Sequence, residues 1–192
     1  MVPHSSDPAL IASDEYSMLC GFYDAVEALL DAPDSILFDT HETISNWSPA
    51  QHLYHILVAG EKSLKAAQLT ARGEGPVQYD GHPNATGAQI LRNGSLGDLK
   101  AEAPASVRPP AFVTREALRE AYRSSRAELN ALADDMPTLS DSKARLPHPA
   151  FGPLRASEWL RFARIHADHH QDIVQEILNA ARSQASKSVQ PA

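Results

Sequence analysis

Two histidines in the C-terminal part of the chain, His166 and His170, have the spacing of a metal-chelating pair. Residues four apart on an α-helix lie about 40° from each other around its axis, so both side chains point the same way, one turn apart. Neutral imidazole is the commonest metal ligand among protein side chains. The sequence therefore predicts that this pair supplies half of a metal site. The alternative is two core histidines that hydrogen-bond to the backbone or to a carboxylate.

The helix face that carries the pair is apolar, which indicates that both imidazoles point into the protein. The apolar residues on this side are Trp159, Phe162, Ala163, Ile173, Val174 and Ile177. An imidazole buried without partners loses its hydration, at a cost of about a few kcal/mol. We therefore expect each ring to have a ligand or a hydrogen-bond partner.

A third ligand has to come from a facing helix, and residues 49–72 contain two histidines, His52 and His55. Periodicity alone slightly favours His52. This residue lies about 40° from Ile56, at the edge of the main apolar stripe. His55 lies on a second face of small residues that includes Ala59.

The remaining histidines fall outside this pattern. His169 is about 60° around the helix from His166, so it fits the rim of the site better than a ligand position. Four others occur in polar or loop segments, where histidines are usually solvated: His4, His41, His82 and His148.

Four amphipathic segments predict the helices that position these histidines. The clearest start is at Ser48, which is an N-cap candidate, because Pro49 suits the first helical position and Gln51 completes a capping box. Ser13 and Thr114 are the expected caps of the first and third helices. We expect helices over about residues 14–32, 49–72, 115–135 and 157–181.

The connections between these helices predict the topology. Segment 73–113 is rich in Gly, Pro, Asn and Ser, with a short helical turn expected near residues 88–91, while 136–154 reads as a linker and 183–192 as a polar tail. A single long connection between the second and third helices makes those two parallel. The predicted fold is all-α: residues 1–192 form one four-helix-bundle domain with one long crossover and no strand.

Two parts of the sequence resemble a known family. Residues 47–55 read WSPAQHLYH, which resembles the start of the second helix in the DinB/YfiT-like superfamily of four-helix-bundle metalloenzymes. Residues 148–154 (HPAFGPL), 158–162 (EWLRF) and 166–170 (HADHH) resemble the turn and the final helix of that family. The match covers the second and fourth helices directly, whereas the first and third agree in placement and length.

The resemblance implies a complete ligand set. In the family a metal-ligand histidine stands eight positions after the tryptophan, which here is His55, and the last two ligands correspond to His166 and His170. One departure is Arg155, which stands where a capping Thr or Ser is expected, so the cap of the fourth helix is expected at Ser157.

Three protein nitrogens leave one coordination position open, the arrangement of a catalytic rather than a structural site. The expected cofactor is a divalent ion: Zn, Ni or another first-row transition metal. Such an ion can activate water for hydrolysis or bind a thiol as thiolate, and the superfamily contains hydrolases and thiol-dependent transferases or isomerases. We therefore expect an enzyme acting on a small molecule, with a low-molecular-weight thiol as a candidate partner. The alternative is a non-catalytic metal-binding or stress-related bundle protein.

A zincin-like peptidase is disfavoured, because Ala167 stands where that motif has its glutamate base. Asp168 lies about 160° around the helix from His166 and is expected on the solvated face. Glu61 and Glu158 remain as candidate bases, although carboxylates in such positions are more often surface or capping residues.

Composition narrows the choice of partners and compartment. The 24 acidic and 17 basic residues give a net charge of −7, which argues against nucleic acid or an anionic membrane as partner. The sequence shows neither a run of about 18 apolar residues nor a signal-peptide pattern. Cys20 is the only cysteine, so no intramolecular disulfide can form. We expect a cytoplasmic protein.

The crossover is expected to roof an apolar pocket beside the metal site and to carry the contacts that select the substrate. Its end also contains three apolar residues that the helices do not account for, Val107, Phe112 and Val113. Together with the family resemblance, these residues suggest a homodimer.

A homodimer makes a direct prediction about molecular mass. The chain weighs 20.8 kDa, so light scattering of the purified protein should give twice this value. A mass equal to that of one chain at working concentration would contradict the dimer.

Overall fold

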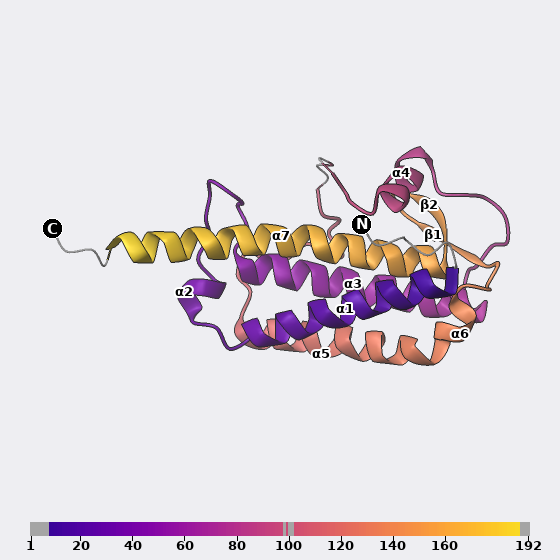
Figure 1. The fold of residues 1–192 in the computed structure, drawn as a ribbon, viewed down its shortest axis with the longest axis horizontal. Helices are drawn as coiled ribbons and strands as arrows, with labels where there is room; N and C mark the ends of the chain where they lie inside the picture. Colours follow the sequence, from indigo (N-terminus) through magenta and orange to yellow (C-terminus); the bar gives the residue numbers. More distant parts are fainter. Residues whose placement is uncertain (1–7, 98, 100–101, 189–192) are drawn as a thin grey trace.

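The computed structural model describes residues 8–97, 99 and 102–188. Four long helices form the body of the protein: α1 (Pro8–Leu29), α3 (Pro49–Arg72), α5 (Arg115–Leu132) and α7 (Ala156–Ser188). The shorter elements are α2 (Asp34–Leu37), α4 (Ala85–Asn93), η1 (Ala133–Asp135), α6 (Met136–Leu139), β1 (Arg145–His148) and β2 (Gly152–Arg155). The predicted all-α bundle is confirmed (Figure 1).

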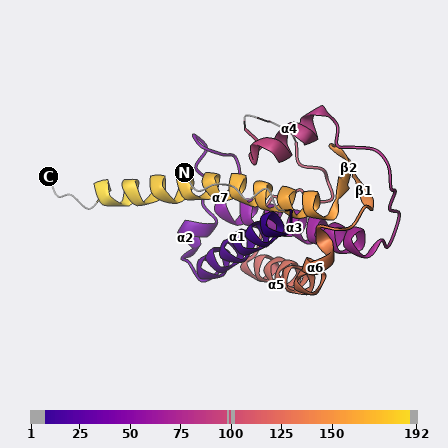
Figure 2. The same ribbon diagram turned by 45° about the vertical axis from the view of Figure 1, so that its right-hand side comes forward.

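The four long helices surround a common core. Helix α3 packs against both α5 and α7, and α1 packs against the same two helices. Helices α3 and α5 run in one direction and α1 and α7 in the other, which confirms that the second and third long helices are parallel (Figures 1 and 2). Fully buried leucines from all four helices fill the centre, among them Leu19, Leu57, Leu129 and Leu160.

The predicted caps of α3 and α5 are confirmed. Ser48 Oγ accepts a hydrogen bond from Gln51 N at 3.3 Å, and Gln51 Oε1 accepts one from Ser48 N at 3.0 Å, which completes the capping box. At the other end of α3, Gly73 adopts φ 69°, a left-handed conformation that favours glycine, and closes the helix. Thr114 Oγ1 caps α5 by accepting from Ala117 N at 3.1 Å.

Helices α1 and α7 are longer than the sequence pattern predicts. Helix α1 begins at Pro8, so Ser13 lies inside it and does not cap it. Proline suits the first turn of a helix because it has no N–H to leave unpaired there. Helix α7 continues to Ser188, seven residues beyond the expected end, since residues 156–188 contain neither glycine nor proline to stop it.

The start of α7 also differs from expectation. Helix α7 begins at Ala156, which places Arg155 rather than Ser157 at the cap position. The Arg155 backbone N–H donates to Glu158 Oε2 at 2.8 Å. Glu158 thus supplies half of a capping box without a serine or threonine partner.

A β-hairpin lies in the segment that was predicted to be a linker without strands. Strands β1 and β2 pair antiparallel, with Leu146 opposite Leu154 and Pro147 opposite Pro153. The strands have four residues each, too short for an alternating pattern to be recognised. The absence of strands was therefore a wrong prediction. Arg145 and Gln78 exchange two backbone hydrogen bonds, which join the crossover to this hairpin.

The helical turn expected in the crossover is a full helix, α4. Asn84 caps it by accepting from Gly87 N at 2.9 Å, and Asn84 also donates from Nδ2 to Ala150 O at 2.8 Å. A Cβ on Gly87 would lie 2.7 Å from Phe151 Cβ, so only glycine permits this approach of α4 to the hairpin turn.

A buried ion cluster joins α1, α4 and α7. The Glu15 carboxylate, on α1, is 5 % exposed and accepts from both Arg161 and Arg164 of α7. The same guanidinium groups donate to main-chain oxygens at the end of α4, Arg161 to Leu91 O at 2.6 Å and Arg164 to Gly94 O at 3.4 Å. Cations suit this end of a helix, where carbonyl groups lack intrahelical partners.

Among the helices of the described residues, none combines the length and apolar character that a membrane crossing requires.

The ion cluster generates a prediction about stability. Replacing Glu15 by Gln removes the charge while keeping the shape. Arg161 then loses its carboxylate, and Arg164 keeps only its pair with Asp168. Breaking such a buried pair costs about 3 kcal/mol or more, so urea denaturation should show a large loss of unfolding free energy.

Glu120→Gln is the matched control for this substitution. Glu120 pairs with Arg123 at 2.7 Å on the exposed face of α5, and exposed pairs contribute little to stability. Equal, small effects of the two substitutions would show that the Glu15 cluster does not hold the three helices together.

Candidate metal centre

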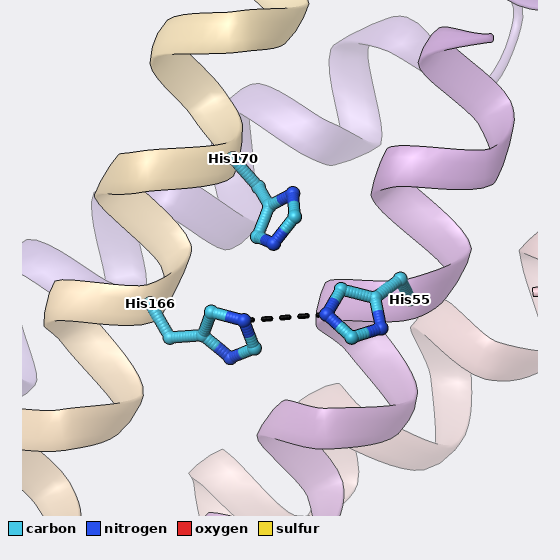
Figure 3. A group of neighbouring side chains, drawn as sticks. All are labelled: His55, His166 and His170. Atoms are coloured by element: carbon cyan, nitrogen blue, oxygen red, sulfur yellow. Dashed lines mark hydrogen bonds between the residues drawn. The ribbon is translucent and has the colours of Figure 1, made fainter. Parts of the chain in front are cut away.

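Helices α3 and α7 bring three imidazoles together inside the bundle. One ring nitrogen from each of His55, His166 and His170 lies within 4.8 Å of the other two. Figure 3 shows the two α7 rings and the α3 ring facing a common space. The Nε2 atoms of His55 and His166 are 3.2 Å apart. His55 and His170 are buried, and His166 is half-buried.

The outer nitrogen of His55 is held by the crossover. His55 Nδ1 lies 2.8 Å from the main-chain oxygen of Val107. A carbonyl oxygen can only accept a hydrogen bond, so Nδ1 carries the proton in the neutral ring. His55 Nε2 therefore presents a lone pair to the shared space, which is the form that a metal ion requires.

The proton between His55 and His166 can be placed by the same reasoning. Because His55 Nε2 carries a lone pair, the 3.2 Å contact is a hydrogen bond only if His166 Nε2 is the donor. In the metal-free protein His166 thus has its proton inside the cluster. For all three Nε2 atoms to act as ligands, this proton has to leave His166 Nε2.

The outer nitrogen of His170 faces His52, the histidine that periodicity slightly favoured as the third ligand. His52 Nδ1 is 2.9 Å from His170 Nδ1, and His52 Nε2 is 2.8 Å from Ser45 Oγ. His52 therefore lies behind His170 and outside the three-histidine cluster. Periodicity was misleading because the face of α3 with small residues, which carries His55, is also buried.

Trp47 packs against this group of rings. Its centroid lies 5.3 Å from that of His52 and 5.3 Å from that of His55, and it stacks nearly parallel to His170 at 6.3 Å. The tryptophan of the motif at residues 47–55 therefore covers one side of the cluster. Its bulk separates the imidazoles from solvent there.

Burial keeps the clustered imidazoles neutral. Desolvation lowers the pKa of His52 to about 4 and that of His166 to about 3, and nearby histidines add to both shifts. Burial also lowers the pKa of His170 and that of His55. All four rings are therefore in the neutral form at neutral pH. Each has one protonated nitrogen and one lone pair that is available to a partner or an ion.

His148 is the functional-region residue that the sequence reading missed, because it was expected to be solvated. It is half-buried against aromatic rings, 4.5 Å from Phe151 and 4.8 Å from Phe162 between centroids. Phe162 in turn stacks on His166 at 5.6 Å. Desolvation lowers the pKa of His148 to about 4. His148 lies in a Pro-rich hairpin, whose short strands gave no periodic signal of burial.

The other histidines are placed as follows. His169 is half-buried with its ring edge-on to His170 at 5.2 Å, beside the cluster and outside it. His41 hydrogen-bonds through Nδ1 to Thr43 Oγ1 at 2.9 Å. His82 is exposed. His4 lies outside the described residues.

Two of the three carboxylates considered for catalysis are paired with arginines. Asp168 pairs with Arg164. Glu158 pairs with Arg145 at 3.3 Å and caps α7. Glu61 is half-buried on α3.

The crossover reaches the site, as expected. Besides the Val107 contact, Gln51 Nε2 donates to Pro110 O at 3.1 Å and to Ala111 O at 3.2 Å. A surface hollow of about 420 Å³ lies beyond this point, between α2 and the start of α5, with Phe38 and Phe112 in its wall. The hollow is separate from the histidines, so an apolar pocket beside the cluster stays a prediction.

The apolar residues at the end of the crossover differ in exposure. Val113 is 2 % exposed and belongs to the core, whereas Phe112 is 75 % exposed. Val107 is half-buried. A homodimer stays a prediction, and of these residues Phe112 offers the most apolar surface for it.

The fold and the site together define a class of protein: a helical bundle with a three-histidine cluster between two of its helices. The chain belongs to the DinB superfamily, whose family model matches residues 22–174. This match includes all three clustered histidines, and it confirms the family resemblance of the sequence. No curated protein and no solved structure matches the chain.

The burial of His148 generates a prediction about pH. Its pKa is about 4 when folded and about 6.5 in an unfolded chain. The unfolded state therefore binds more protons between these values, so the contribution of His148 to stability is complete above pH of about 6.5 and falls as pH drops toward 4.

His148→Asn isolates this contribution, because Asn does not titrate and can still accept the hydrogen bond that His148 Nδ1 receives from Ala150 N. Urea denaturation of both metal-free proteins at pH 7 and pH 5 should show the wild type losing more unfolding free energy than the variant. An equal loss in both would mean that His148 titrates as a solvated residue.

Proposed function

We propose that this protein is a metal-dependent enzyme that acts on a small molecule, with a divalent ion held by His55, His166 and His170. The observation that carries the proposal is the convergence of three neutral imidazoles in one buried space. At two of them the outward Nδ1 atom already has a hydrogen-bond partner. Membership of the DinB superfamily supports the same assignment.

The separations in the cluster fit such an ion. Nitrogen atoms bound to one tetrahedral ion at about 2.0 to 2.1 Å lie about 3.3 to 3.4 Å from one another. The His55 and His166 Nε2 atoms are 3.2 Å apart, and all three ligand atoms lie within 4.8 Å. Small side-chain movements are therefore enough to complete the set. Three imidazole nitrogens suit Zn, Ni or another first-row transition metal.

The three ligands leave a coordination position open. When bound, the ion supplies Lewis acidity at this position and lowers the pKa of a coordinated water or thiol. The ligands are all neutral, so they do not reduce the charge of the ion as thiolates or carboxylates would. This property favours the binding of an anion such as a thiolate.

The surroundings of the cluster favour thiol chemistry over hydrolysis. Hydrolysis benefits from a general base that takes a proton from water. Glu158 and Asp168 are paired with arginines. A thiol that loses its proton when it binds the ion needs no general base in the reaction that follows. We therefore propose a thiol-dependent transferase or isomerase first, with a hydrolase as the second reaction class.

The chain's own residues shape the space around the open position. Trp47 shields the His52 side of the cluster, and Phe162 stacks on His166. The crossover approaches from the side of His55 through Val107. These groups limit access of water and leave a partly apolar surface for the organic part of a substrate.

The metal assignment predicts the metal content of four variants. Elemental analysis of purified wild type should give about one first-row transition metal ion per chain, since the cluster is one site. His55→Ala, His166→Ala and His170→Ala should each lose most of it. His82→Ala, on the exposed surface, is the matched control and should retain it.

Activity then separates an enzyme from a metal-binding protein without catalysis. Metal-loaded wild type and His82→Ala should turn over a thiol-conjugation substrate or an ester, and His170→Ala should not. Metal content that depends on the three histidines without turnover of either substrate class would support the non-catalytic alternative. Unchanged metal content in all three ligand variants would rule out the proposed site.

A further inference from the structure

A second, outer line of hydrogen bonds runs from the cluster to the loop before α3. His52 is 3 % exposed and lies one turn before His55. Its Nδ1 atom contacts His170 Nδ1 at 2.9 Å, and its Nε2 atom contacts Ser45 Oγ at 2.8 Å. Ser45 Oγ also accepts a hydrogen bond from the backbone N–H of Trp47 at 3.1 Å. Both nitrogens of the buried His52 ring are therefore occupied.

Two arrangements of protons fit these contacts. In the first, His170 Nδ1–H donates to His52 Nδ1, and His52 Nε2–H donates to Ser45 Oγ. In the second, the Ser45 hydroxyl donates to His52 Nε2, and His52 Nδ1–H donates to His170 Nδ1. The first leaves the His170 Nε2 atom with a lone pair, and the second puts a proton on it.

The surroundings of the cluster end of the line favour the first arrangement. His170 Nε2 faces the space that it shares with His55 and His166 (Figure 3), where His166 Nε2–H already occupies the lone pair of His55. A second N–H directed into this space would point at a donor. At the other end, Ser45 Oγ has two lone pairs, so it can accept from both the Trp47 N–H and the His52 Nε2–H, as the first arrangement requires.

We propose that His52 and Ser45 are positioning residues that hold His170 as the Nδ1–H tautomer, with its Nε2 lone pair directed into the cluster. They do for His170 what the main-chain oxygen of Val107 does for His55. The tautomer is a property of the metal-free protein, whereas its use in metal binding rests on the proposed function. Partners of this kind fix the ring orientation of a ligand and raise its basicity.

The tautomer can be read directly by nitrogen NMR of metal-free protein labelled with ¹⁵N-histidine. Long-range ¹H–¹⁵N spectra at neutral pH distinguish a protonated from an unprotonated ring nitrogen, and the His170 signals are identified by their loss in His170→Ala. In the wild type we expect a protonated Nδ1 and an unprotonated Nε2. A protonated Nε2 in the wild type would overturn the proposal.

Three variants test whether His52 and Ser45 cause this state. His52→Ala should shift His170 toward the Nε2–H form, and Ser45→Ala should do so to a smaller extent. His52→Asn should preserve the wild-type form, because its amide oxygen can accept from His170 Nδ1–H. His169→Ala is the control, since it removes a ring that touches His170 edge-on at 5.2 Å. An unchanged His170 tautomer in both His52→Ala and Ser45→Ala would overturn the proposal.

Zinc affinity, measured by competition with a chromophoric chelator, gives the second readout. Loss of a partner behind a metal-ligating histidine typically weakens metal binding about 10- to 100-fold. We expect a loss in this range for His52→Ala, a smaller loss for His52→Asn and little change for His169→Ala. Equal affinities of His52→Ala and wild type would contradict the positioning role.

The two readouts separate this proposal from the proposed function. A wild-type protein with the expected tautomer that fails to bind zinc would contradict the metal site and leave the positioning role of His52 and Ser45 intact. If the protein binds zinc through the three histidines but substitutions at Ser45 and His52 leave the His170 tautomer unchanged, the metal site is retained and the positioning role is excluded.

Discussion

Burial of several imidazoles in one space is the constraint on which the rest of this structure depends. Each neutral ring has one donor and one acceptor nitrogen, and an unpaired polar atom inside a bundle is costly. Val107 O accepts from His55, and His52 lies against His170. The cluster is therefore stable only when the crossover and the loop before α3 are in place around it.

The crossover is placed by contacts at some distance from the cluster. The Glu15 ion cluster fixes the end of α4 against α7, and the hairpin holds the start of α4 through Asn84. The last part of the crossover is held at α3, where Gln51 donates to the main-chain oxygens of Pro110 and Ala111. The long loop is thus secured at both ends, and Val107 meets His55 between them.

The sequence predicted the features that depend on neighbouring residues. The capping box at Ser48 and the helical spacing of His166 and His170 are local patterns, and both were confirmed. The choice of His55 over His52 came from the family resemblance, because both histidines of α3 face α7 and periodicity cannot tell which of them joins the cluster. The hairpin and the burial of His148 were missed, since short strands and proline-rich turns leave no periodic signal. The early start of α1 was missed because Ser13, which lies inside the helix, offered a competing cap signal.

The crossover is attached to the bundle largely through its main chain. His55, Gln51, Arg161 and Arg164 all donate to its backbone oxygens, namely those of Val107, Pro110, Ala111, Leu91 and Gly94. Because a carbonyl group is the same in every residue, exposed side chains of this loop can mutate without loss of these bonds. In evolutionary terms, the side chains of this loop can diverge while the histidine geometry beneath it is inherited unchanged.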